Sequence, residues 1–260
     1  MVQNIQVLRC FAALAVVLHH LQLQMHDQLG SPILGFAGRA GVEVFFVISG
    51  FIMFHTTRNN DRTVLQFWTD RAIRIAPAYW MATWAVVLLF WLNLYPIGVR
   101  ALSGGDIIAD MLFLPNYRAD GDAYPILDVG WTLNYEMYFY LLFGLTFFLR
   151  SQAAALCMLT GWFILTAIVS AYGPPLPHAL EFFFEPITLE FAGGGALALL
   201  YRRNLRLTPA ATKHLGYATL VAGLVLMITD AVLWGEYVNW NPTLRTAAFG
   251  IPAIFIVSGA

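Results

Sequence analysis

Apolar residues fall in long runs along this chain, and short polar connections separate the runs. An α-helix needs about 20 apolar residues to cross a bilayer, which is the length of most of these runs. None of the runs shows the ten-residue alternation that is typical of a membrane β-barrel. The sequence therefore predicts an all-α, polytopic transmembrane helical bundle with about eight spans, at roughly 5–24, 40–56, 75–98, 130–149, 153–172, 181–201, 214–234 and 244–260.

The second expected span is short, and it contains both Glu43 and Gly50. Glycine weakens a helix interior, so we expect this helix to be partial or broken. Two interpretations of the pair Ser49–Gly50 stay open. The helix unwinds locally there beside a cavity, or the small residues allow another helix to pack closely.

Composition supports membrane insertion and excludes other classes. Of the 260 residues, 59% are hydrophobic and only 11% are charged, whereas a soluble domain has about 25% charged residues. A net charge of −1 argues against nucleic acid as the main partner. Cys10 and Cys157 both lie in apolar runs, so we expect neither a disulfide framework nor a metal site. The first run lacks a small-residue cleavage site and is expected to be an uncleaved anchor.

The distribution of the 14 cations predicts the orientation of the spans. With a cytoplasmic N-terminus, all but four fall at inner ends, which satisfies the positive-inside rule. The four on the outside are Arg39, Arg100, Arg118 and Arg245. The 99–129 connection carries Asp106, Asp110, Asp120, Asp122 and Asp128 and is expected to be an external, well-solvated loop. A role for this loop, with Tyr117 and Tyr124, as an acceptor surface is the alternative.

Ionisable groups inside a span are costly and suggest function. Arg9 and His20 are eleven residues apart on the first expected helix. That spacing is about three turns, so the two side chains share one face, roughly 16 Å apart along the axis. The alternative is that Arg9 reaches the lipid headgroups and His20 lies at the outer interface.

Three carboxylates also lie inside expected spans. Glu43, in "GVEVFFVISGF", must face a cavity or a partner cation, and Glu136, in "GWTLNYEMYFY", lies too deep for the interface. The rings beside Glu136, Trp131 and Tyr135 among them, are expected to form an interfacial aromatic belt. Glu190 precedes three glycines, which usually indicate close helix packing.

Arg71 and Arg74 are one helical turn apart, at the start of the third expected span. Ordinary positive-inside bias accounts for any single arginine at this edge. A helix N-terminus, however, attracts anions, and the planar guanidinium matches phosphate oxygens. A phosphate-binding pair is therefore the second interpretation, and physical chemistry alone leaves both open.

Several stretches together resemble the acyltransferase-3 family of integral membrane acyltransferases, over essentially the whole chain. They are "LRCFAALAVVLHH", "GVEVFFVISGFIM", "RAIRIAPAYW", "GWTLNYEMYFYLLF" and "LEFAGGGAL". The resemblance is closest to members that acylate exopolysaccharide, O-antigen or nodulation-factor sugars. It implies an acyl donor, most often cytoplasmic acetyl-CoA, and a sugar hydroxyl acceptor outside the bacterial inner membrane.

The resemblance also implies roles for individual residues. The family's first-helix arginine falls on Arg9 and its essential histidine on His20, not on His19. Its arginine pair falls on Arg71 and Arg74, and its two acidic positions fall on Glu43 and Glu136. We therefore expect His20 and Glu136 to be catalytic and Arg9, Arg71 and Arg74 to bind acyl-CoA, while Glu43, Ser49, Trp131, Tyr135 and Glu190 are further polar candidates.

Family members have about ten spans, so we expect residues 1–260 to be a single acyltransferase domain that lacks its last two helices. His20 is expected to act as a general base or to carry the acyl group itself. Two other functions stay open. One is a transporter in which buried histidine and glutamate form an ion or proton path, and the other is a structural or polymer-assembly membrane subunit.

Overall fold

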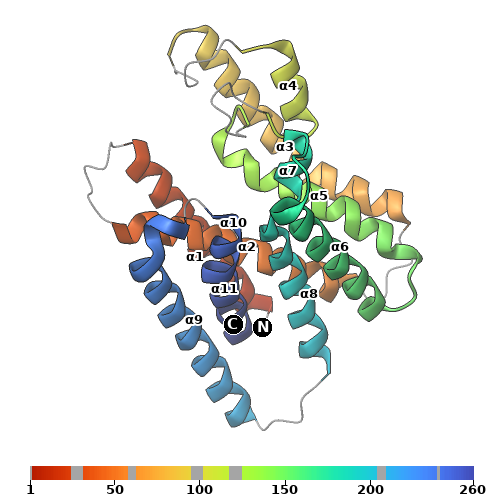
Figure 1. Cartoon of the computed structure of the whole chain (residues 1–260), viewed down its shortest axis with the longest axis vertical. Coiled ribbons are helices and arrows are strands. Elements are labelled where there is room, and N and C mark those ends of the chain that lie inside the picture. Colours follow the sequence, from red (N-terminus) through yellow and green to blue (C-terminus); the bar gives the residue numbers. More distant parts are fainter. Residues whose placement is uncertain are drawn as a thin grey trace. The chain divides into compact units, whose positions relative to one another are not determined.

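The computed structural model describes residues 2–24, 32–57, 63–94, 102–116, 125–203, 209–238 and 241–260, and these hold helices but no β-strand. The α-helices are α1 (Val2–Gln24), α2 (Pro32–Thr56), α3 (Val64–Trp91), α4 (Gly104–Met111), α5 (Trp131–Leu145), α6 (Gln152–Tyr172), α7 (His178–Phe183), α8 (Leu189–Arg202), α9 (Pro209–Val238), α10 (Pro242–Arg245) and α11 (Ile251–Gly259) (Figure 1). Short 3₁₀ turns are η1 (Asp128–Gly130), η2 (Thr146–Phe148) and η3 (Pro186–Thr188), and η4 (Thr246–Gly250) is a π-helical turn.

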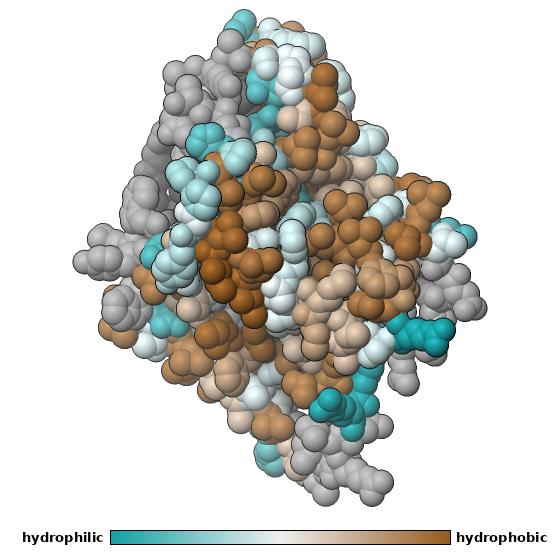
Figure 2. Space-filling model, turned by 45° about the vertical axis from the view of Figure 1, so that its right-hand side comes forward, coloured by the Kyte–Doolittle hydropathy of each residue, from teal (hydrophilic) through white to brown (hydrophobic). Residues whose placement is uncertain are grey.

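Among the described residues, helices lie within each of the eight expected spans, and the all-α prediction is confirmed. Six stretches of the described residues are long and apolar enough to cross a membrane: Gln3–Leu21, Gly38–Thr56, Val64–Trp91, Gln152–Tyr172, His178–Arg202 and Pro242–Gly259. Large apolar side chains on these helices are exposed, as Phe11, Ile73 and Leu165 are, and Figure 2 shows many such side chains on one face. Their natural environment is lipid, and the chain is a multi-pass membrane protein.

The chain divides into two compact units, which are described separately. The first consists of Met1–Asn60, Ser151–Thr166 and Glu185–Ala260. In it, α2 packs against α1, α8 and α11 (Figure 1). Most of α2 is therefore buried, whereas α1 is largely exposed. The core of this unit lies around α2.

The expectation that the second span is short or broken is wrong, because α2 runs without interruption through Gly50. Gly50 instead permits the close approach of α8. A Cβ at this position would lie 2.0 Å from the carbonyl oxygen of Phe191, and one at Gly194 would lie 1.9 Å from that of Val47. The packing interpretation of the small residues is thus the one that the structure supports.

The last part of the first unit changes its helical geometry at a proline. Asn241 caps α10 by accepting a hydrogen bond from the backbone N–H of Leu244 at 3.0 Å. The chain then forms η4 before α11. Pro252, near the start of α11, has no N–H to donate and its ring crowds the preceding turn. The π-helical turn η4, just before Pro252, accommodates the missing backbone N–H. Such turns are frequent at functional sites.

The second unit consists of Asp61–Arg150 and Ala167–Phe184, in which α3 packs against α5 and α4. The helix α3 begins at Val64, eleven residues before the expected start at 75. Thr63 accepts a hydrogen bond from the backbone N–H of Gln66, and the Gln66 side chain accepts one from the N–H of Thr63. This reciprocal capping box fixes the start of the helix.

Candidate functional site

In the first unit, α1 carries both Arg9 and His20. The helix is unbroken between them, so the expected spacing of three turns on one face is present. Both side chains are half-buried. The neighbouring His19 lies against α2, because a Cβ at Gly38 would lie 2.1 Å from the Cβ of His19. The two histidines therefore have different surroundings, although their rings are only 5.5 Å apart.

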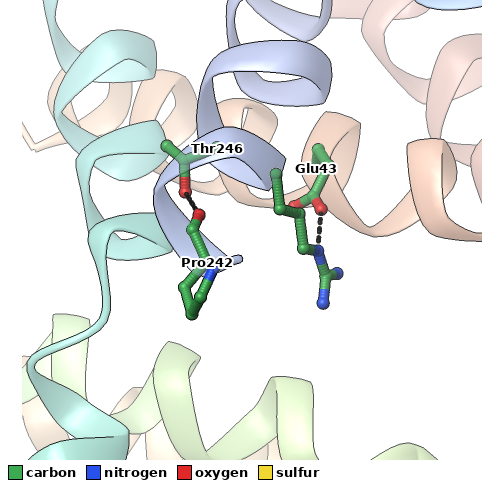
Figure 3. A network of polar contacts seen from close by, with 4 residues as sticks. Glu43, Pro242 and Thr246 are labelled. Carbon is green, nitrogen blue, oxygen red and sulfur yellow. Dashed lines mark hydrogen bonds and ion pairs between the residues drawn. The ribbon is translucent and has the colours of Figure 1, made fainter. Parts of the chain in front are cut away.

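Glu43 has the partner cation that its burial requires. Its side chain is fully buried, and Nε of Arg245 donates to Oε1 of Glu43 at 2.8 Å. Figure 3 marks this contact with a dashed line and shows Glu43 beside the turn that carries Pro242 and Thr246. The positive-inside rule predicts Arg245 to be one of the external cations. The two residues are 202 positions apart, and no local signal joins them.

Glu190 belongs to the same group of charges. It is 2% exposed, at the start of α8, and its carboxyl group interacts with both Glu43 and Arg245. A Cβ at Gly250, in η4, would lie 2.7 Å from Oε1 of Glu190. The structure thus brings Glu43, Glu190 and Arg245 together. Ser49 is buried on α2, almost two turns beyond Glu43.

Arg202 has a role in packing, whereas the positive-inside rule predicts only that it lies at the cytoplasmic end of a span. Its guanidinium donates to the carbonyl oxygens of Phe54 and His55 and to the side chain of Gln152. Phe54 and His55 lie in the last turn of α2, where backbone carbonyls have no partner within the helix. Arg202 therefore caps α2 and neutralises the negative end of its dipole.

In the second unit, Arg71 and Arg74 are not equivalent. Arg71 is half-buried, and its guanidinium carbon lies 5.4 Å from the centroid of the Phe67 ring and 5.7 Å from that of Tyr140. Arg74 is exposed. The prediction that a helix N-terminus helps this pair to bind an anion is wrong. Helix α3 begins at Val64, and both arginines lie at least a turn and a half inside it. What orients Arg71 is instead the contact with aromatic rings.

Glu136 meets the same aromatic ring as Arg71. The hydroxyl of Tyr140 donates to Oε1 of Glu136 at 3.2 Å, and Trp68 donates through Nε1 to the backbone oxygen of Tyr140 at 3.1 Å. Tyr140 thus connects the expected catalytic carboxylate with an expected donor-binding arginine. The sequence analysis missed this role of Tyr140, although its spacing of four residues from Glu136 on a helix was a usable signal.

The aromatic belt expected beside Glu136 is wrong for Tyr135. This side chain is 1% exposed, its hydroxyl donates to the backbone oxygen of Phe182 at 2.7 Å, and its ring stacks on that of Phe182. It fastens α5 to α7 within the second unit. Trp131 is half-buried, and its ring packs edge-on against Tyr135.

The prediction of a well-solvated loop at 99–129 is wrong for Asp110, while Asp120, Asp122, Tyr117 and Tyr124 lie outside the described residues. Asp110 is fully buried at the end of α4. It accepts hydrogen bonds from the hydroxyl of Tyr79 at 3.2 Å, from Nδ2 of Asn116 at 2.8 Å and from the N–H of Ile126 at 3.0 Å. Burial raises the pKa of Asp110 to about 6, although these hydrogen bonds act in the opposite direction.

The described residues thus present two sets of polar groups. In the first unit, Arg9 and His20 lie along α1, and Glu43, Glu190 and Arg245 form a buried group. In the second unit, Arg71 and Glu136 both contact Tyr140. Within the described ranges, no three His, Cys, Asp or Glu side chains are grouped as a metal site requires. Arginines and a histidine are suited to binding phosphate and to moving a proton.

Comparison with known proteins identifies relatives over most of the sequence. The model of a family described as an acyltransferase domain matches residues 2–260. The exopolysaccharide production protein ExoZ of Rhizobium meliloti is 33% identical, over 73% of this chain and 59% of the relative. The peptidoglycan O-acetyltransferase OatA of Listeria monocytogenes is 25% identical, over 94% of this chain and 41% of the relative.

A third relative is the acyltransferase MdmB of Streptomyces mycarofaciens, 29% identical over 76% of this chain and 57% of the relative. The chain thus spans about half the length of the curated relatives it matches. No solved structure matches it.

Proposed function

Because the chain belongs to the acyltransferase-3 family, we propose that it moves an acyl group, most simply acetyl, from acyl-CoA to a sugar hydroxyl of an exported or cell-surface polysaccharide. The observation that carries this proposal is the family match over residues 2–260. Names of the relatives support the acceptor, since one is an exopolysaccharide production protein and another a peptidoglycan O-acetyltransferase. We place the protein in the bacterial inner membrane with a cytoplasmic N-terminus, as the distribution of its cations predicts.

In this proposal, one face of α1 joins donor and acceptor. Arg9 and His20 are separated by roughly 16 Å along an unbroken helix. The pantetheine arm of acyl-CoA is long and thin, and it can follow this face from the nucleotide end toward His20. Arg9 then contacts a phosphate of coenzyme A, and His20 meets the thioester.

His20 acts on the proton in the transfer step. As a general base it accepts the proton of the sugar hydroxyl while the hydroxyl oxygen attacks the thioester carbonyl carbon. The carbon–sulfur bond breaks, the new ester bond forms, and the proton passes from the imidazole to the departing thiolate. Coenzyme A leaves as its thiol, so the step is balanced and needs no other reactant. Formation of an acyl-imidazole on His20 is the alternative route.

In the second unit, Arg71 and Arg74 are the proposed phosphate-binding residues for the donor. Charge-assisted hydrogen bonds from a guanidinium to phosphate are strong and directional. Arg71 is already ordered by the rings of Phe67 and Tyr140, so it loses little side-chain freedom when it binds. Glu136, which accepts from Tyr140, stays a proposed catalytic residue, and this hydrogen bond orients its carboxylate.

Turnover of radiolabelled acetyl-CoA by the purified chain in lipid nanodiscs, with bacterial exopolysaccharide as acceptor, tests the proposal. His20→Ala is expected to abolish label transfer and to leave donor binding nearly intact. His19→Ala is the matched control, because it changes the adjacent histidine on the same helix, and it is expected to keep activity. Full activity of a folded His20→Ala protein would overturn the catalytic assignment. A folded wild type that binds no acyl-CoA would favour a transport function instead.

A further inference from the structure

A second chemical feature of the first unit is its buried group of two carboxyl groups and one guanidinium. Glu43 is fully buried and Glu190 is 2% exposed, while Arg245 is one-quarter exposed through its side chain. They come from α2, α8 and α10, three elements that are far apart in the sequence. The proposed acyl transfer does not use Glu190 or Arg245.

The charges of this group do not balance if both carboxyl groups are ionised. Arg245 supplies one positive charge against two negative ones. Among the described residues of the other elements packed on α2, η4 and α11 contain no ionisable side chain, and α1 places His19 against Gly38, more than a turn before Glu43. Helix α9 carries Lys213, His214 and Asp230, and α2 itself carries Arg39 one turn before Glu43. The charged groups that act on Glu190 are nevertheless Glu43 and Arg245. Glu185, which precedes η3 and is half-buried, also interacts with Arg245 and adds a further negative charge. An unbalanced buried charge is strongly unfavourable.

The two carboxyl groups also have fewer hydrogen-bond donors than they can accept from. Oε1 of Glu43 accepts from Arg245, but no donor from the described part of the chain reaches Oε2 of Glu43 or either carboxylate oxygen of Glu190. The Glu190 carboxyl group nevertheless lies close enough to that of Glu43 for the two to interact electrostatically. Two carboxylates side by side repel each other, whereas a single proton on one of them supplies the missing donor and removes one charge. The N-terminal position of Glu190 on α8 favours its ionised form, but this dipole effect is small beside the cost of a second buried charge.

We propose that Glu190 is a proton-binding site, which holds one proton beside the Glu43 carboxylate and Arg245. In this state the three buried side chains Glu43, Glu190 and Arg245 are together neutral, with one carboxylate paired to the guanidinium and one carboxylic acid, and Glu185 at the half-buried edge keeps its own charge. Arg245 directly precedes the π-helical turn η4, and Gly250 of that turn lies against Glu190. Release of the proton therefore changes the charge beside Arg245, which precedes η4, and beside Gly250, which ends η4.

A metal cation is the competing ligand for two buried carboxyl groups. Within the described residues these two carboxyl groups have no third His, Cys, Asp or Glu that would complete a metal site. The guanidinium, which already contacts Glu43, also repels a second cation. A proton needs neither additional oxygen ligands nor space, so it is the ligand that this group fits.

Infrared spectroscopy of the full chain in nanodiscs tests the site, because a protonated carboxyl group has a carbonyl stretching band that shifts in D₂O. The measurement is made about two pH units above the pKa of Asp110, where that group is ionised. Wild type is expected to show the band. Glu43→Gln and Glu190→Gln are each expected to lose it, because the one remaining carboxyl group ionises beside Arg245. Glu181→Gln, which changes an exposed carboxylate, is expected to keep it.

Absence of the band from wild type, or a band of unchanged intensity in both glutamine variants, would overturn the proposal. If one variant fails to fold, the band in wild type and its loss in the other variant still test the proposal. Replacing choline chloride by NaCl is expected to leave the band unchanged, and its loss would assign the site to a metal cation instead. The measurement uses no acyl-CoA, so its failure is independent of whether acyl transfer occurs.

Discussion

Arg245 Nε lies 2.8 Å from Oε1 of Glu43, across 202 residues of sequence and inside the first unit. The ion pair joins the short helix α10 to the buried helix α2. Removing one partner of a buried ion pair leaves the other charge without compensation, and this costs about 3–5 kcal/mol. The pair therefore makes the last helical segment part of the same folded unit as α2.

Arg245→Ala is accordingly expected to destabilise the protein by about 3–5 kcal/mol. Thermal and denaturant unfolding in detergent micelles measures the change. Arg150→Ala removes an exposed arginine and is expected to have little effect. The double variant Arg245→Ala/Glu43→Gln is expected to recover part of the loss, because it also removes the carboxylate that the guanidinium compensates. Equal stabilities of the Arg245 and Arg150 variants would show that the ion pair contributes nothing.

Substitution of Gly50 is expected to separate α2 from α8. A Cβ there would lie 2.0 Å from the carbonyl oxygen of Phe191, and backbone atoms cannot move aside as a side-chain end can. We expect Gly50→Ala to cost roughly 1–3 kcal/mol or more.

The control for this substitution is Gly161→Ala in α6, where an added Cβ meets no atom within 4 Å. Alanine favours a helix over glycine by about 1 kcal/mol, so this variant is expected to be as stable as wild type or more stable. Unfolding curves of the two variants in the same detergent give the comparison, and a Gly50→Ala protein as stable as Gly161→Ala would contradict the packing.

Asp110 is expected to make stability depend on pH. Its pKa is about 6 in the folded protein, above the value near 3.9 of an unfolded aspartate. Between these values the folded state binds more protons than the unfolded state, so stability falls as the pH rises. The contribution is fully present below about pH 4, is lost by about pH 6, and amounts to roughly 3 kcal/mol at most.

Thermal unfolding followed between pH 4 and 7 measures this dependence. Asp110→Asn is expected to remove the slope, because asparagine does not titrate. Asp128→Asn changes an exposed carboxylate of the same connection and is expected to keep the slope. A wild-type profile without a slope in this range, or one that rises with pH, would be inconsistent with a raised pKa.

Tyr135→Phe is expected to weaken the attachment of α7 to α5. The substitution keeps the ring that stacks on Phe182 and removes only the hydroxyl that donates to the Phe182 backbone oxygen. One buried hydrogen bond contributes about 1 kcal/mol, and chemical denaturation measures a change of this size. Tyr172→Phe, at an 87% exposed ring, is the control and is expected to be neutral. Equal behaviour of the two variants would contradict the role of the Tyr135 hydroxyl.

The features that could be predicted best are those that depend on residues close together in the sequence. The apolar runs predicted helices in the right places, and the depth of Glu43 in a span predicted a cavity or a partner cation, of which the structure shows the cation. Which cation this is could not be predicted, because Arg245 is joined to Glu43 only by the packing of α10 against the first unit. The early start of α3 was missed although a signal existed, since threonine at 63 and glutamine at 66 form a recognisable capping box.

Other features depend on tertiary contacts that cannot be predicted from composition. Asp110 is one of five aspartates in an acidic connection, and only the packing of Tyr79, Asn116 and Ile126 around it makes it buried. Likewise, the aromatic residues near Glu136 have the composition of an interfacial belt, yet Tyr135 faces Phe182 inside the second unit. Hydropathy gives the depth of a residue in a span but not the direction in which its side chain points.

Equilibrium binding of acetyl-CoA to the purified chain tests the proposed function most directly. Wild type is measured beside Arg71→Ala and Arg74→Ala, with Arg150→Ala as a control for the loss of one arginine. Loss of a charge-assisted hydrogen bond costs about 1.5–3 kcal/mol, or roughly ten- to hundredfold in affinity. We predict specific binding by wild type, a loss of this size in Arg71→Ala, a smaller loss in the exposed Arg74→Ala, and partial rescue by Arg71→Lys. Unchanged binding by folded Arg71→Ala and Arg74→Ala proteins would contradict the phosphate-binding role of both arginines.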